Sequence, residues 1–142
     1  MRRHVLPDVV SGSIVRSRLF CNGCSAVSDV LEREPCVKLV VGSAKQQSLP
    51  SMLDKEFKEY GTDSVCPATC GRRGPADVRK QRFLEREPAV MFFHLIRAQQ
   101  NGRKNNNAVE FPEVLTCMRT GAYHFASVVR HKGRASNQGH YL

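Results

Sequence analysis

Four of the six cysteines stand in two close pairs whose spacing is typical of metal ligands. Two residues separate Cys21 from Cys24, three separate Cys66 from Cys70, and 41 residues lie between the pairs. A gap of two or three residues lets one turn present two sulfur atoms to one ion, and tetrahedral zinc takes four such ligands. The pairs therefore predict a structural zinc site. The alternatives are four buried thiols, or a remnant site that has lost its metal.

A histidine near the end of the sequence has neighbours that distinguish it from the other four histidines. His140 stands between Gly139 and Tyr141, after an apolar-rich segment, the residues His131-Lys-Gly133 and a short polar loop. A histidine can take the proton of a nucleophilic thiol, and a carboxylate or amide can orient that histidine. The alternative interpretation of His140 is an ordinary histidine at the edge of a strand.

Other cysteines and histidines are expected to pack rather than react. Cys36 and Cys117 lie in apolar segments, and we expect both in the core. His94 lies in the most apolar run of the chain and is also expected to be packed, while His131 is expected to be structural.

Strands are expected to position these groups. Alternation of apolar and polar residues predicts a strand that runs into Cys21. The Gln99–Asn107 segment, rich in asparagine, predicts an exposed turn. The most apolar run, which Pro88 introduces, predicts a buried central strand. The other expected strands or extended segments are 36–41, 76–84, 109–115 and a closing strand from Tyr123.

One helix is expected between residues 48 and 60. Its apolar residues recur at helical spacing, Ser51 and Asp54 resemble a capping box, and Gly61 is placed to end it. One helix among many strands predicts an α+β fold that is mainly antiparallel β.

Composition and charge limit the class of protein. A chain of 142 residues with 41% apolar content suits one modest domain with a core. No run approaches eighteen apolar residues, and the start lacks a secretory signal, so we expect an intracellular protein without a membrane partner. Residues 1–70 hold 9 Lys and Arg against 8 Asp and Glu, whereas residues 71–142 hold 13 against 5, a net charge of +8. This basic half suits a solvated face better than a nucleic-acid site, because it predicts neither a basic helix nor a regular aromatic platform.

Several motifs, taken in order, resemble the ubiquitin-specific proteases. In that family a strand Tyr-x-Leu-x-Ala-Val-x-x-His-x-Gly precedes a loop and Gly-His-Tyr, and nine residues match this pattern: Tyr123, Phe125, Ala126, Val129, His131, Gly133, Gly139, His140 and Tyr141. The two cysteine pairs resemble those of the family's fingers. Further landmarks are Ser48-Leu49, Ala76 with Lys80, the segment from Pro88 to Arg97, and Val109-x-Phe111-Pro112.

The resemblance implies a fold and an activity. Residues 11–142 would form part of a papain-like peptidase domain, with fingers at about 11–75 and a palm at about 76–142, after an N-terminal extension at 1–10. The family hydrolyses the peptide or isopeptide bond that follows the ubiquitin C-terminus, so ubiquitin or a ubiquitinated protein is the implied partner. The resemblance assigns His140 as the general base, and its fingers carry a structural zinc.

The resemblance also implies that parts of the catalytic set lie outside this sequence. The family's nucleophile stands in an Asn-x-Gly-Asn-Thr-Cys box before the fingers, and none of the six cysteines has those neighbours. The orienting Asp or Asn follows Gly-His-Tyr at some distance in the family. We therefore expect no activity from this chain alone. Two alternatives stay open: a ubiquitin-binding pseudoenzyme, and a zinc-ribbon module that binds nucleic acid through the basic half.

Overall fold

The computed structural model describes residues 12–116, 119, 121–135 and 138–142. The chain divides into two compact units. The first unit holds the described residues up to Val37 together with Asp54–Phe92, and the second holds Lys38–Leu53 and the described residues of Phe93–Leu142. Among the described residues, no helix has the length and apolar character needed to cross a membrane.

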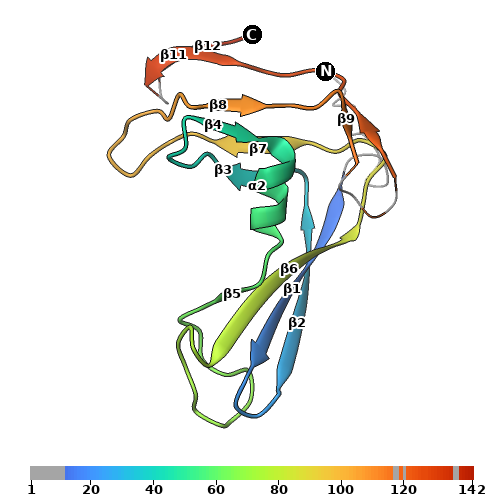
Figure 1. Cartoon of the computed structure of the whole chain (residues 1–142), viewed down its shortest axis with the longest axis vertical. Coiled ribbons are helices and arrows are strands. Elements are labelled where there is room, and N and C mark those ends of the chain that lie inside the picture. The colour runs from blue at the N-terminus through green and yellow to red at the C-terminus, as the bar shows by residue number, and fades with distance from the viewer. Residues whose placement is uncertain (1–11, 117–118, 120, 136–137) are drawn as a thin grey trace, which may run out of the picture. The chain divides into compact units, whose positions relative to one another are not determined.

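An antiparallel sheet of four strands forms the first unit (Figure 1). In spatial order its strands are β2 (Val27–Glu34), β1 (Ser13–Cys21), β6 (Val78–Arg86) and β5 (Tyr60–Gly61). Val15, Cys21 and Val78 are fully buried in this unit. The alternation that predicted a strand up to Cys21 reflects this burial, and the prediction of mainly antiparallel β structure is confirmed.

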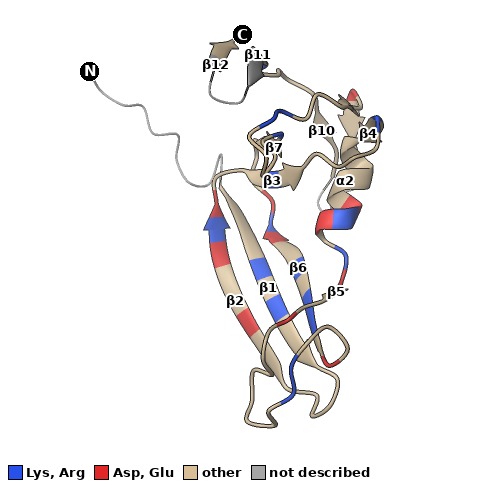
Figure 2. Cartoon of the chain, turned by 90° about the vertical axis from the view of Figure 1, so that its left-hand side faces the viewer, with Lys and Arg blue, Asp and Glu red and all other residues tan. Residues whose placement is uncertain are grey.

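Strand β2 was not predicted. It pairs with β1 from Phe20↔Val27 to Ser13↔Glu34, yet Val27, Val30 and Leu31 are 52%, 54% and 60% exposed. As an edge strand with both faces open to solvent, it lacks the alternation that marks a half-buried strand. Figure 2 shows acidic residues on β2 and basic residues on the neighbouring β1. Arg18 of β1 makes two hydrogen bonds of 2.8 Å to Asp29 of β2, which help to specify this pairing.

Short strand pairs build the second unit. The pairs are β4 (Gln46–Ser48) with β8 (Ala108–Glu110), which is parallel, and two antiparallel pairs, β9 (Val114–Leu115) with β10 (Tyr123–His124) and β11 (His131–Ala135) with β12 (Gln138–Tyr141). β3 (Val37–Val40) pairs with β7 (Phe93–Ile96). The Val37 amide donates to the Phe92 carbonyl, and the Val41 amide donates to the Ile96 carbonyl. Donor and acceptor positions thus both increase along the chain, as in a parallel pair.

The helix α2 (Leu49–Glu56) lies within the range 48–60 that the sequence predicted, but it ends before the predicted end. The Ser48 hydroxyl accepts a hydrogen bond from the Ser51 amide at 3.3 Å, so Ser48 is the N-cap and the predicted capping box at Ser51 is wrong. The helix ends at Glu56 rather than at Gly61, which lies in β5. Its buried residues, Leu49, Met52 and Leu53, keep the predicted helical spacing.

The apolar run after Pro88 is not a buried central strand. Only Phe93–Ile96 forms a strand, Val90 and Phe92 are 43% and 48% exposed, and His94 is exposed. Within the described residues this strand has β3 as its sole neighbour, which leaves it too little cover to be buried. The predicted closing strand is likewise shorter: β10 holds two residues, and the β11–β12 hairpin follows it.

Candidate metal centre and histidine hairpin

The turn from β1 to β2 positions the first cysteine pair. The Cys21 amide donates to the Ala26 carbonyl and the Ser25 amide donates to the Cys21 carbonyl, both at 2.9 Å. Ser25 adopts a φ of 56°, a left-handed conformation that reverses the chain. This tight turn places the exposed Cys24 next to the buried Cys21.

A loop between β5 and β6 positions the second pair. The Cys66 amide donates to the Arg72 carbonyl at 2.8 Å, and Val65 and Arg73 form an isolated β-bridge. Inside this loop the Ala68 amide donates to the Cys66 sulfur at 3.3 Å. Cys66 is buried and Cys70 is exposed, so each pair has one buried and one exposed thiol.

The four sulfur atoms converge. All lie within 4.8 Å of one another, with 3.7 Å between Cys21 and Cys70 and 3.5 Å between Cys24 and Cys66. Sulfurs at the zinc–thiolate distance of about 2.3 Å on a tetrahedron are about 3.8 Å apart, so this arrangement fits one tetrahedral ion. The donors are all thiolates, which favours a soft or borderline metal over calcium or magnesium.

The thiols differ in acidity because their surroundings differ. Backbone hydrogen bonds from Cys24 and then Gly23 outweigh burial and lower the pKa of Cys21 to about 7. Burial, followed by the neighbouring thiols, raises the pKa of Cys66 to about 12. Because metals bind thiolates, occupation of this cluster must release protons, and it would cancel the cost of a buried negative charge at Cys66.

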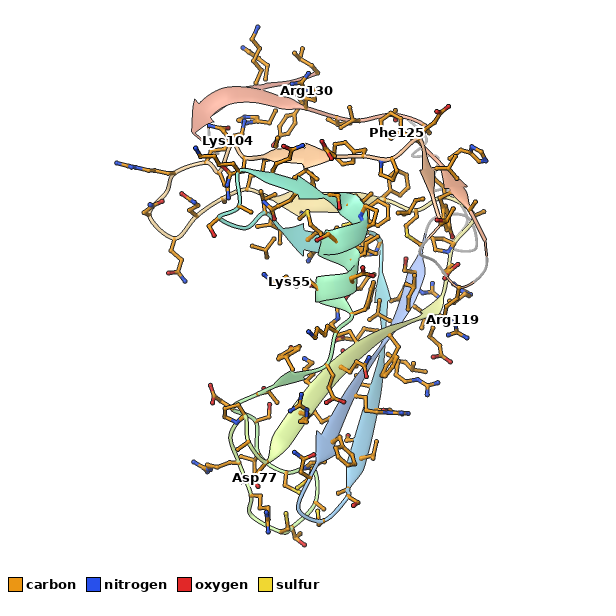
Figure 3. All side chains as sticks on the ribbon, in the orientation of Figure 1. Lys55, Asp77, Lys104, Arg119, Phe125 and Arg130 are labelled. Carbon is orange, nitrogen blue, oxygen red and sulfur yellow. The ribbon has the colours of Figure 1, made fainter. Side chains whose placement is uncertain are left out.

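Contacts outside the sulfurs tie the two cysteine loops together. The Asn22 amide donates to the Asp77 carbonyl at 2.8 Å, and the Asn22 side chain donates to the Ala76 carbonyl at 3.1 Å. Arg72 forms a salt bridge of 3.0 Å with Asp77 and lies so close to Gly23 that a Cβ there would be 2.3 Å from its Cδ. Figure 3 labels Asp77 beside these loops. The sequence did not reveal these supports, because arginine and asparagine in a glycine-rich turn resemble ordinary loop residues.

His140 lies on the exposed β12 strand of the terminal hairpin. Its strand partner is Lys132, and among the described residues nothing hydrogen bonds to its imidazole. Gly139 has a φ of 146°, and a Cβ at this position would be 2.3 Å from the Lys132 carbonyl oxygen and 2.7 Å from His131 Nε2. The glycine before His140 is therefore required by the close approach of β11.

The remaining histidines and cysteines for which the sequence predicted a structural role differ in burial. The His131 ring packs against that of Tyr141 with centroids 5.1 Å apart, in keeping with the structural role predicted for it. His94 is exposed, so its predicted place in the core is wrong, and Cys36 is only half-buried. Cys117 lies outside the described residues.

The asparagine-rich loop is not the simple exposed turn that the sequence predicted. Gln99, Asn101 and Gly102 are exposed, but Asn105 is only 7% exposed and its amide donates to the carbonyls of Val41 and Gly42 at 2.9 Å each. A run of asparagines indicates a loop by composition, and composition does not distinguish a solvated amide from one that satisfies buried carbonyls.

The chain matches a known protein family over almost its whole length. A family model described as ubiquitin carboxyl-terminal hydrolase matches residues 3–142. No curated protein sequence matches the chain.

Solved structures share this fold. A structure of the yeast SAGA DUBm with an Sgf73 mutant has a TM-score of 0.79 and 25% identity, covering 94% of this chain and 32% of that one. A SAGA DUB module of Ubp8, Sgf11, Sus1 and Sgf73 bound to monoubiquitin has a TM-score of 0.75, also with 25% identity and the same coverage. A further module, bound to ubiquitin aldehyde, has a TM-score of 0.76 and 23% identity, and shows the fold alone. The chain thus spans about a third of the length of the chains it matches.

Proposed function

Because the chain belongs to the ubiquitin carboxyl-terminal hydrolase family, we propose that it forms the fingers and much of the palm of a ubiquitin-specific cysteine protease. Such an enzyme hydrolyses the peptide or isopeptide bond that follows the ubiquitin C-terminus. The observation that carries the proposal is the family match over residues 3–142, which includes both cysteine pairs and the histidine hairpin. A structure at 25% identity whose partner is monoubiquitin supports ubiquitin as the partner of this chain.

His140 is the proposed general base. Its imidazole is exposed on β12, where a thiol from another segment has access to it, and Gly139 lets the two strands of the hairpin approach closely. In the proposed reaction, His140 takes the proton of the nucleophilic cysteine as the sulfur attacks the carbonyl, and then gives a proton to the leaving amine.

The four-cysteine cluster is the proposed zinc site. Cys21, Cys24, Cys66 and Cys70 would fill all four tetrahedral positions, so the ion would hold the tip of the first unit together and leave no position for substrate. An intracellular setting suits this proposal, because reducing conditions keep the four thiols from forming disulfides.

The isolated chain is proposed to lack turnover, since none of its cysteines has the neighbours of the family's nucleophile. A fluorogenic ubiquitin substrate tests this together with the His140 assignment. We expect no release of fluorophore from either the unmodified chain or its His140→Ala variant. Turnover that the variant abolishes would reveal a nucleophile among these cysteines, and turnover that survives it would remove His140 as the base. If a longer protein that contains this chain bound ubiquitin but also lacked turnover, the pseudoenzyme would be favoured.

Nucleic-acid binding is a second candidate because residues 71–142 carry a net charge of +8. Binding by phosphate contacts would weaken steeply with salt, because each neutralised phosphate releases counterions. A gel shift with duplex DNA and with RNA at about 50 and about 200 mM salt measures this. We expect weak binding that disappears at the higher salt. A tight complex that survives there would favour the nucleic-acid module.

A further inference from the structure

Lys104 links the asparagine-rich loop to the histidine hairpin. Its Nζ donates to the carbonyl of His131 at 2.7 Å and to that of Gly133 at 3.3 Å. Figure 3 labels the Lys104 side chain. Both acceptors lie on β11, two residues apart, and Lys104 is half-buried. The Lys104 ammonium therefore binds the backbone of one strand rather than water alone.

The pairing of the hairpin explains why these two carbonyls need a donor. Arg130 and Leu142 exchange amide-to-carbonyl hydrogen bonds of 2.8 Å in both directions. In an antiparallel pair such exchange alternates along the strands, so Lys132 and His140 form the next hydrogen-bonded pair. The carbonyls of His131 and Gly133 then point away from β12, and the Lys104 ammonium satisfies both.

The backbone around Lys104 is held in place by neighbouring residues. Asn105 follows it directly and is anchored through its side-chain amide to the carbonyls of Val41 and Gly42. Arg97 Nη1 donates to the carbonyls of Asn105 and Asn107 at 3.1 and 2.7 Å. The loop that carries Lys104 is thus anchored by hydrogen bonds, and the Lys104 ammonium fixes β11 relative to this loop.

We propose that Lys104 is a positioning residue that sets the place of His140 by holding β11, the strand with which the His140 strand pairs. The inference rests on the proposed role of His140 as the general base. Lys104 acts on His140 through the strand: it donates to the carbonyls of His131 and Gly133 on β11, and Lys132 of β11 pairs with His140.

Amide hydrogen exchange tests the proposal in the chain as it stands. Lys104→Met keeps the aliphatic stem and removes the donor, Lys104→Arg keeps the charge, and Arg103→Met changes the exposed neighbour as a control. We expect Lys104→Met to speed exchange at the Lys132 and His140 amides roughly tenfold or more, since charge-assisted hydrogen bonds are the strong ones. The β4–β8 amides should keep their rates, and the imidazole signals of His140 should shift. Lys104→Arg should restore both measurements, and Arg103→Met should leave them unchanged.

The unmodified chain gives an independent measurement. Lys104 should react with an amine-specific reagent roughly tenfold more slowly than the exposed Lys132. Equal reactivity, an unchanged hairpin in Lys104→Met, or equal losses in β4–β8 and the hairpin would each overturn the proposal. The hairpin could respond as expected while the chain shows no affinity for ubiquitin. That result would support the structural effect of Lys104 and contradict the proposed function.

Discussion

Each thiol of the cysteine cluster depends on contacts that a serine or alanine could not reproduce. Cys21 at the end of β1 and Cys66 in the loop between β5 and β6 are buried, whereas Cys24 and Cys70 are exposed. A hydroxyl does not bind zinc as a thiolate does, so one substitution should open a closed four-ligand site.

Metal content tests the cluster. We expect about one zinc ion per unmodified chain by elemental mass spectrometry, because four converging thiolates complete a structural site. Cys66→Ser should lower the content severalfold and unfold the loop between β5 and β6. Cys36→Ser is the matched control, since Cys36 lies outside the cluster, and it should retain the ion. Equal zinc content in the two variants would contradict the site.

Gly139 provides a second prediction at the scale of one residue. Gly139→Ala should destabilise the hairpin by about 1–3 kcal/mol from backbone strain, with a further cost because the added Cβ meets the Lys132 carbonyl at 2.3 Å. Gly102→Ala is the matched control: Gly102 also has a positive φ, of 76°, but a Cβ there meets nothing within 4 Å. Amide exchange in β11 and β12 measures the difference, and equal effects of the two changes would count against the close approach.

At the scale of elements, Arg82 joins three parts of the first unit. It lies on β6 and forms ion pairs with Glu34 at the end of β2 and with Glu56 at the end of α2. The Arg82 side chain is 17% exposed, against 37% for Arg79, which lies on the same strand and pairs with Glu59. Burial decides which pair matters, because exposed ion pairs contribute little to stability.

Urea unfolding followed by the β1 and β6 amide signals tests this difference. Arg82→Met should lower the free energy of unfolding of the first unit by about 1–3 kcal/mol, because it leaves two half-buried carboxylates without their partner. Arg79→Met should cost less than about 1 kcal/mol. Equal losses would mean that the Arg82 pairs are no stronger than surface pairs.

The strands and the helix differ in how far the sequence could predict them. Short-range patterns succeeded: alternation up to Cys21 predicted β1, and the spacing of Leu49, Met52 and Leu53 predicted a helix. Features set by distant partners failed. The edge strand β2 has no buried face to leave a pattern, and Asn105 is buried only because the carbonyls of Val41 and Gly42 come to lie beside it.

For the molecule as a whole, the order of motifs was more informative than any one of them. The cysteine pairs and Gly139-His140 each have ordinary explanations alone, but in sequence they indicated the family that the match over residues 3–142 shows. The boundary between fingers and palm near residue 75 stays a prediction. Lys104 and Arg72 were missed because a lysine that binds backbone carbonyls and an arginine packed over a glycine have no spacing of their own.

Calorimetric titration of the zinc-loaded chain with monoubiquitin tests the central claim most directly. Duplex DNA is titrated in parallel, and both titrations are run at about 50 and about 200 mM salt. We expect saturable one-to-one binding of ubiquitin that persists at the higher salt, with DNA binding lost there. Absence of saturable ubiquitin binding by the folded, zinc-loaded chain, together with DNA binding that survives, would contradict it.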